Sequence, residues 1–134
     1  MPIDIYAEEL ISNYEHPHNK GKINDPNAEM HEYNPICGDD ITLYLKIKED
    51  IVDDVKFDGK GCAISIGVAS MLTDSIKGKR LEDIDAIGFK DIVKILGMDP
   101  GPARAKCASI SLKALKKAIF LYQHKTVDRD TEKL

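Results

Sequence analysis

The stretch "ITLYLKIKEDIVDDVKFDG", residues 41–59, decides the fold. Its first half alternates apolar and polar residues, which predicts a strand with one buried face. The apolar set is Ile41, Leu43, Leu45 and Ile47, and the polar set is Thr42, Tyr44, Lys46 and Lys48. Glu49-Asp50 is typical of a turn, and residues 51–59 return as a second, less regular strand. The sequence therefore predicts an antiparallel hairpin with one apolar face.

Helical patterns surround this hairpin. Residues 3–14 place Ile3, Tyr6, Leu10 and Tyr14 at helical spacing, and "NAEMHEY", residues 27–33, adds a possible third strand. Residues 62–78 indicate a mostly buried helix, and 81–97 one or two short helices that end at Gly97. A last helix is predicted over 105–124, with an apolar stripe of Ala108, Leu112, Leu115, Ile119 and Tyr122. The predicted class is α+β: a small antiparallel sheet of about three strands with helices packed on one face.

Length and charge limit the number of domains and the classes of partner that the chain can have. The 134 residues predict a single domain, 1–134, with a polar and frayed tail over about 126–134. The net charge of −4 gives no electrostatic case for nucleic acid. No apolar stretch is as long as a membrane span, and the acidic N-terminus "MPIDIYAEEL" is unlike a targeting peptide, so we expect no membrane contact and a cytoplasmic location.

The chain has three cysteines, an odd number that argues against a closed disulfide framework. Cys37 precedes the long strand, Cys62 lies between the second strand and a helix, and Cys107 falls in the first turn of the last helix. Two of them stand at helix N-termini, where the helix dipole favours thiolate over thiol. Asp39, two residues after Cys37 across a glycine, offers a carboxylate to the same ion, with Asp40 as its competitor. Three thiolates and one carboxylate suit zinc or one iron of a cluster.

At this point the chain resembles the iron–sulfur cluster assembly scaffolds, the family that contains IscU, SufU and the N-terminal part of NifU. "YAEELISNYEHPHNKGKINDP" is similar to the opening of the family, and "NPICGDDITLYLKI", "FDGKGCAIS" and "KCASIS" are similar to its three ligand motifs. The resemblance implies a three-stranded IscU/SufU-like fold. It also implies that Cys37, Asp39, Cys62 and Cys107 hold a [2Fe–2S] cluster, or Zn²⁺ or Fe²⁺ in the same site.

The resemblance further implies partners. Sulfur would come from a cysteine desulfurase of the IscS or SufS type, with Cys107 as the candidate persulfide acceptor, and the cluster would pass to apo iron–sulfur proteins. A homodimer that shields an exposed cluster stays open. The expected role is assembly of the cluster without catalysis.

Two departures from the family pattern keep alternatives open. Lys106 stands where IscU proteins carry a histidine, and its charge is a candidate stabiliser of the Cys107 thiolate. Loss of that histidine resembles SufU proteins, yet the insertion typical of SufU between the second and third cysteines is missing. "DPGPARAKC" matches the chaperone-binding motif of IscU only loosely. The alternatives are a zinc-dependent sulfurtransferase that relays persulfide sulfur and a structural zinc-binding module.

Overall fold

The computed structural model describes residues 5–124 and 127–134. Its elements are α1 (Ile5–Glu15), β1 (Ala28–Asn34), β2 (Asp39–Lys48), β3 (Ile51–Lys60), α2 (Ala63–Ile76), α3 (Leu81–Asp85), α4 (Phe89–Leu96), α5 (Ala105–Tyr122) and α6 (Arg129–Glu132). The strands form one antiparallel sheet in the order β1-β2-β3. The predicted hairpin and the possible third strand are both confirmed.

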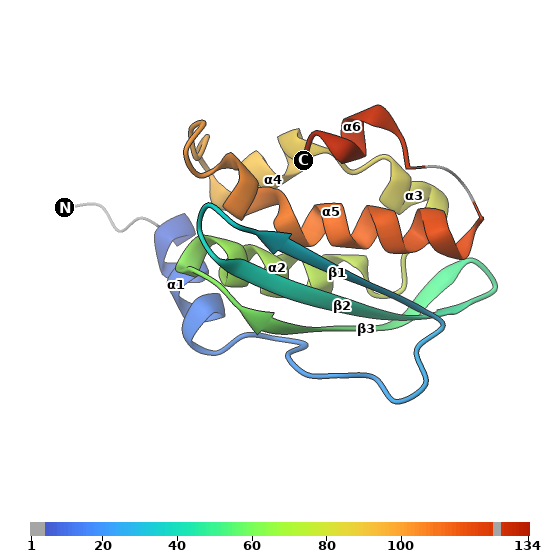
Figure 1. The fold of residues 1–134 in the computed structure, drawn as a ribbon. Helices are drawn as coiled ribbons and strands as arrows, with labels where there is room; N and C mark the ends of the chain where they lie inside the picture. The colour runs from blue at the N-terminus through green and yellow to red at the C-terminus, as the bar shows by residue number, and fades with distance from the viewer. Residues whose placement is uncertain (1–4, 125–126) are drawn as a thin grey trace.

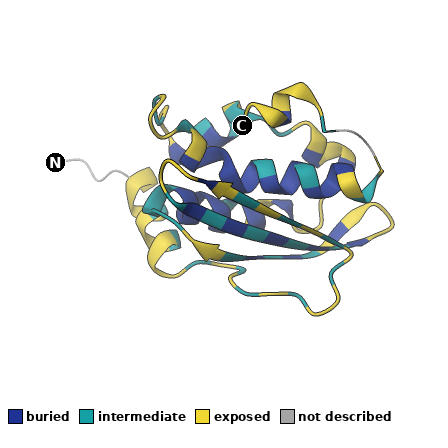
Figure 2. Ribbon diagram, in the orientation of Figure 1, coloured by how far each residue is buried: buried dark blue, intermediate teal, exposed yellow. Residues whose placement is uncertain are grey.

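The hairpin follows its sequence closely. Glu49 and Asp50 both have positive φ, 52° and 61°, as a two-residue turn of type I′ requires. The apolar residues of β2 point inward and are at most 3% exposed: Ile41, Leu43, Leu45 and Ile47. The last three pair with Phe57, Val55 and Val52 of β3. This inner face is covered by α2 and α5, which lie on the same side of the sheet (Figure 1). Figure 2 shows the resulting buried layer between the sheet and these helices.

The first helix is attached less firmly than its spacing predicts. Ile3 lies outside the described residues, and Tyr6 and Tyr14 are 51% and 43% exposed, so the expected apolar stripe of α1 is not buried. Leu10 packs against Gly67 on α2, where a Cβ atom would lie 2.5 Å from the Leu10 Cδ1 atom. The Tyr6 ring packs against Gly97 at the end of α4, where a Cβ atom would lie 2.3 Å from the Tyr6 Cγ atom. The helix therefore depends on close approaches at two glycines and on polar contacts.

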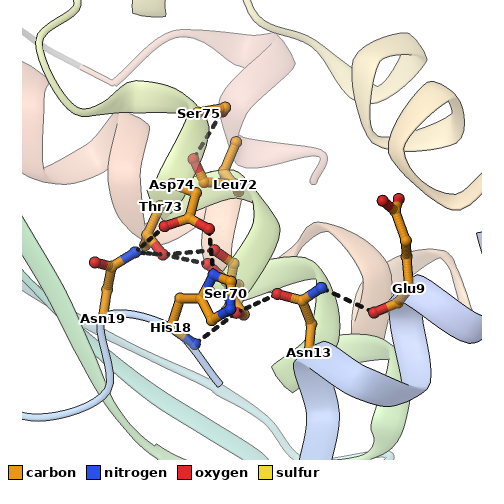
Figure 3. Close-up of polar contacts among 10 residues, drawn as sticks. Glu9, Asn13, His18, Asn19, Ser70, Leu72, Thr73, Asp74 and Ser75 are labelled. Carbon is orange, nitrogen blue, oxygen red and sulfur yellow. Dashed lines mark hydrogen bonds and ion pairs between the residues drawn. The ribbon is translucent and has the colours of Figure 1, made fainter. Parts of the chain in front are cut away.

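Those polar contacts form a cluster between the end of α1, the following loop and α2 (Figure 3). The backbone N–H of His18 donates to Ser70 Oγ at 2.7 Å, and Ser70 Oγ donates to Asn13 Oδ1 at 2.6 Å. The His18 ring bonds Asp74, and Asn19 Nδ2 donates to the same carboxylate at 2.9 Å. Burial acts to raise the pKa of Asp74, but the bonds from His18 and Asn19 outweigh it and hold that pKa below its ordinary value.

The C-terminal segment differs from the prediction of a frayed tail. Asp128 caps α6 by accepting a hydrogen bond from the Thr131 N–H at 2.8 Å, and Thr131 is fully buried. Lys117 on α5 lies 3.9 Å from the Glu132 carboxylate. A polar sequence is therefore ordered here by a cap and by contacts with α5. The helix predicted to end at His124 ends at Tyr122.

Candidate metal centre

The predicted ligands gather at one end of the sheet. Cys37 lies in the β1–β2 turn, Asp39 begins β2, Cys62 is the N-cap of α2, and Cys107 lies in the first turn of α5. Figure 1 shows this turn and the starts of both helices at the same end of the molecule. Antiparallel pairing and the parallel course of α2 and α5 bring together residues that are far apart in the sequence.

Three of the four predicted ligands form a compact group. The ligand atoms of Cys37, Asp39 and Cys107 all lie within 4.8 Å of one another. The Cys107 thiol donates to the Cys37 sulfur at 2.9 Å. Zinc–sulfur bonds of about 2.3 Å in a tetrahedron place ligand atoms about 3.8 Å apart, so the spread of the group suits a single ion. Cys37 is exposed, whereas Cys107 is fully buried.

Cys62 is adjacent to this group without belonging to it. Its sulfur accepts a hydrogen bond from the Ser65 N–H at 3.5 Å and so caps α2. Its own N–H donates to Asp39 Oδ1 at 3.3 Å. The backbone N–H of Cys62 therefore bonds Asp39 of the site, while its sulfur caps the N-terminus of α2. Its membership of the ligand set stays a prediction.

Asp39 is the buried centre of the polar contacts. Its side chain is inaccessible to solvent and accepts hydrogen bonds from Ser65 Oγ at 2.9 Å and Asn34 Nδ2 at 3.3 Å, besides the Cys62 N–H. Gly61 makes room for this arrangement, because a Cβ atom there would lie 2.2 Å from Ser65 Oγ. The competing carboxylate, Asp40, instead bonds His31 at 2.6 Å.

Sequence reasoning missed Asn34 and Ser65. Ser65 stands three residues after the N-cap Cys62, which is the spacing of a capping box, and that signal could have located it. Asn34 holds both ends of the site: its Nδ2 lies 3.8 Å from Cys107 Sγ, and its Oδ1 accepts from the Ile36 N–H at 3.2 Å. Its sequence context carries no comparable signal.

The electrostatics of Cys107 contradict the expected thiolate. Burial, most of all, raises the pKa of the Cys107 thiol far above its ordinary value, and the hydrogen bonds to Cys37 and Asp39 and the Asp39 charge act in the same direction. A metal ion that binds here must displace the Cys107 proton. Cys107 as the candidate persulfide acceptor stays a prediction; its sulfur is buried, whereas Cys62 is partly accessible and Cys37 is exposed to a donor.

The Lys106 ammonium bonds the C-terminal residues and not the ligand group. Its ammonium donates to the backbone carbonyls of Lys133 and Leu134 at 2.6 and 2.9 Å. Within residues 5–124 and 127–134 no hydrogen bond or ion pair joins it to Cys107. Its role as a stabiliser of the thiolate stays a prediction.

The family follows from comparison with known proteins. The model of the NifU-like N-terminal domain matches residues 5–129. The chain belongs to this family. Among its relatives are the zinc-dependent sulfurtransferase SufU of Bacillus subtilis, 39% identical over 86% of this chain and 89% of the relative, and the iron–sulfur cluster assembly scaffold protein IscU 1 of Archaeoglobus fulgidus, 34% identical over 90% and 78%.

Solved structures of the family agree in fold. The N-terminal part of a NifU-like protein from Brucella abortus superimposes with a TM-score of 0.76, covering 92% of this chain and 97% of that one, at 20% identity. The three-stranded sheet with its helices is therefore the fold of the family. In the described part of the chain, no helix combines the length and apolar character that crossing a bilayer would need.

Proposed function

We propose that this protein is a scaffold that assembles a [2Fe–2S] cluster and passes it to apo-proteins. The observation that carries the proposal is the group of Cys37, Asp39 and Cys107, which is buried on one side and open on the other. A buried half can hold iron, and an open half lets a donor or a recipient reach it. Relatives named as scaffolds in Archaeoglobus fulgidus and Escherichia coli support the same role.

Sulfur enters most directly at Cys37. Its thiolate would attack the outer sulfur of a persulfide on a cysteine desulfurase, so that a new sulfur–sulfur bond forms on Cys37 and the desulfurase cysteine leaves as thiolate. A reductant supplied from outside then converts this sulfur to sulfide, which bridges the two irons. Cys107 is 2.9 Å from Cys37, so it is placed to ligate the iron that receives the sulfide.

Asp39 and Cys62 complete the ligand set in this proposal. A carboxylate is a harder and weaker ligand for iron than thiolate, so a recipient cysteine can displace it. For Cys62 to ligate, its sulfur must leave the Ser65 N–H. We propose that one domain carries out all of these steps, in a reducing compartment such as the cytoplasm, since its cysteines are free thiols.

The alternative is a zinc-dependent sulfurtransferase. It is favoured by the 39% identity with SufU of Bacillus subtilis and by Lys106 before the last cysteine in place of the histidine. The same donor set fits Zn²⁺, and Cys37 would then accept sulfur without building a cluster. A purely structural zinc module fits less well, because structural sites are closed and Cys37 is exposed.

Anaerobic reconstitution separates the first two functions. The full chain is incubated with ferrous iron, sulfide and dithiothreitol, desalted, and examined by visible absorption and by iron and sulfide analysis. A scaffold gives a sulfide-to-iron charge-transfer spectrum with two irons and two sulfides bound per site. A chain that retains zinc, gives no such spectrum and still accepts sulfur from a desulfurase would be the sulfurtransferase instead.

A further inference from the structure

Two neighbouring hollows lie along the first half of α5. The larger, about 580 Å³, lies between the start of α4, α5 and the C-terminal residues, and the smaller, about 230 Å³, lies between α5 and the β1–β2 turn. Both are lined by Lys106 and Leu134, so they meet at these two residues. Figure 1 shows the C-terminus over this part of α5, next to α4. Together they form a groove along α5 that reaches Ile36 in the β1–β2 turn, the residue before Cys37.

The charge of this groove is opposite to that of the molecule. The chain carries −4 overall, yet four lysines and one acidic side chain line the larger hollow: Lys90, Lys106, Lys116, Lys133 and Asp130. The smaller one is lined by Lys113 and by Glu32, whose carboxylate is paired with Lys117 at 2.9 Å. The Lys116 ammonium bonds the neutral carbonyl of Ile87 at 2.6 Å, so this hydrogen bond does not cancel its charge. Lys106 instead bonds the carbonyl of Lys133 and an oxygen of Leu134, the last residue of the sequence, so the cationic excess of the groove rests on Lys90, Lys116 and Lys133.

The rim lysines are free to meet a ligand. Lys90 and Lys133 are exposed, and neither takes part in an ion pair among the residues that the structure describes. Between them the floor is apolar and is built by Phe89, Ala105 and Leu134. At the far end Ile36 is 84% exposed beside the smaller hollow. Apolar floor, cationic rim and extended shape fit a peptide segment better than a compact small molecule.

We propose that this groove docks an acidic segment of a partner protein, with an apolar side chain seated on the floor between Lys90 and Lys133. The partner is identified by chemistry as a protein that exchanges sulfur or cluster with Cys37, so this identification rests on the proposed function. Charge complementarity would steer the partner and hold it beside the metal centre. The binding is salt-dependent, because the rim cations are exposed to solvent.

The test uses a fluorescein-labelled peptide, Asp-Glu-Asp-Leu-Glu-Asp, and fluorescence anisotropy at low salt with the full chain and no added iron or sulfide. We expect saturable binding that weakens at least about fivefold in a K90E/K133E double variant. A K22E/K79E variant has the same net charge, carries its changes on exposed lysines outside the groove, and is expected to bind like the unchanged chain. Replacing the peptide leucine by serine is expected to weaken binding by a similar factor.

Equal weakening in the two double variants would show a non-specific effect of net charge and would overturn the proposal. So would binding of citrate, mapped by NMR to Phe89 and Leu134, in a chain that does not bind the peptide, because the groove would then be a small-anion site. Cluster formation is measured separately on the same samples. Peptide binding without a cluster contradicts the proposed function alone, and a cluster without peptide binding contradicts this inference alone.

Discussion

The β1–β2 turn and the first turn of α5 supply two sulfurs 2.9 Å apart, yet the two regions differ in almost every physical respect. The turn carries Cys37 in solvent, next to the highly exposed Ile36. The helix turn carries Cys107 in the core, with Ala108 and Leu112 of the same helix fully buried. One sulfur can be reached by another protein, and the other is fixed by packing.

This difference indicates a division of labour within one site. A fully exposed site could exchange its cargo but would hold it poorly, and a fully buried site would be a structural metal site. Asp39 and Asn34 connect the halves, because Asn34 contacts both the carboxylate and Cys107. Replacements at each half should therefore separate holding from exchange.

The largest expected effect comes from replacing each cysteine by serine. Cys37→Ser and Cys107→Ser should both weaken Zn²⁺ binding by more than the roughly 10–100-fold that loss of an outer-shell partner costs. Their effects on folding should differ. Cys107→Ser places a hydroxyl in the core and should lower the unfolding free energy by about 1–3 kcal/mol, whereas Cys37→Ser should change it by less than about 0.5 kcal/mol.

Competition with a chromophoric chelator gives the zinc affinities, and urea denaturation with chelator present gives the stabilities. Equal stabilities of the two variants would show that the two cysteines do not differ in burial as described.

A smaller effect is expected at Ser65. Ser65→Ala removes the hydroxyl that donates to Asp39 and leaves that buried carboxylate with fewer donors. We expect zinc affinity to fall about 10–100-fold, as for other outer-shell partners. Ser75→Ala, farther along α2, is the matched control: the Ser75 hydroxyl donates to the Leu72 carbonyl at 2.7 Å, so its removal should leave the affinity unchanged. An unchanged affinity in Ser65→Ala would mean that Asp39 is not held by this contact.

The smallest effect concerns pH. The pKa of Cys107 is raised in the folded chain, so above about pH 8.5 the unfolded chain loses a proton that the folded chain keeps. The unfolded state then binds fewer protons, and stability falls as pH rises, by up to about 1.4 kcal/mol per pH unit. Below that pH, Cys107 is protonated in both states and its full contribution to stability is present. Urea midpoints of chelated protein between pH 7 and 10 measure this, and Cys107→Ala should remove the slope. A slope that persists in Cys107→Ala would assign it to other groups.

The sequence predicted the sheet and the proximity of Cys37, Asp39 and Cys107 from signals that short stretches of sequence carry. These signals are the alternation over residues 41–48 and the position of each cysteine at the end of an element. The burial of Cys107 and the contact of Lys106 with Lys133 and Leu134 depend on how distant segments pack. The polar tail also looks frayed in sequence, whereas in the described residues 127–134 a cap and contacts with α5 order it.

We infer that the exposed half of the site receives sulfur and that the buried half holds it. The most direct test incubates the full chain with a cysteine desulfurase and cysteine under argon, alkylates briefly, and maps the added sulfur by peptide mass spectrometry. We expect the first persulfide to appear on Cys37, and we expect Cys37→Ser to abolish early labelling while Cys62→Ser does not. Early persulfide on Cys107, with Cys37 unmodified, would contradict this inference.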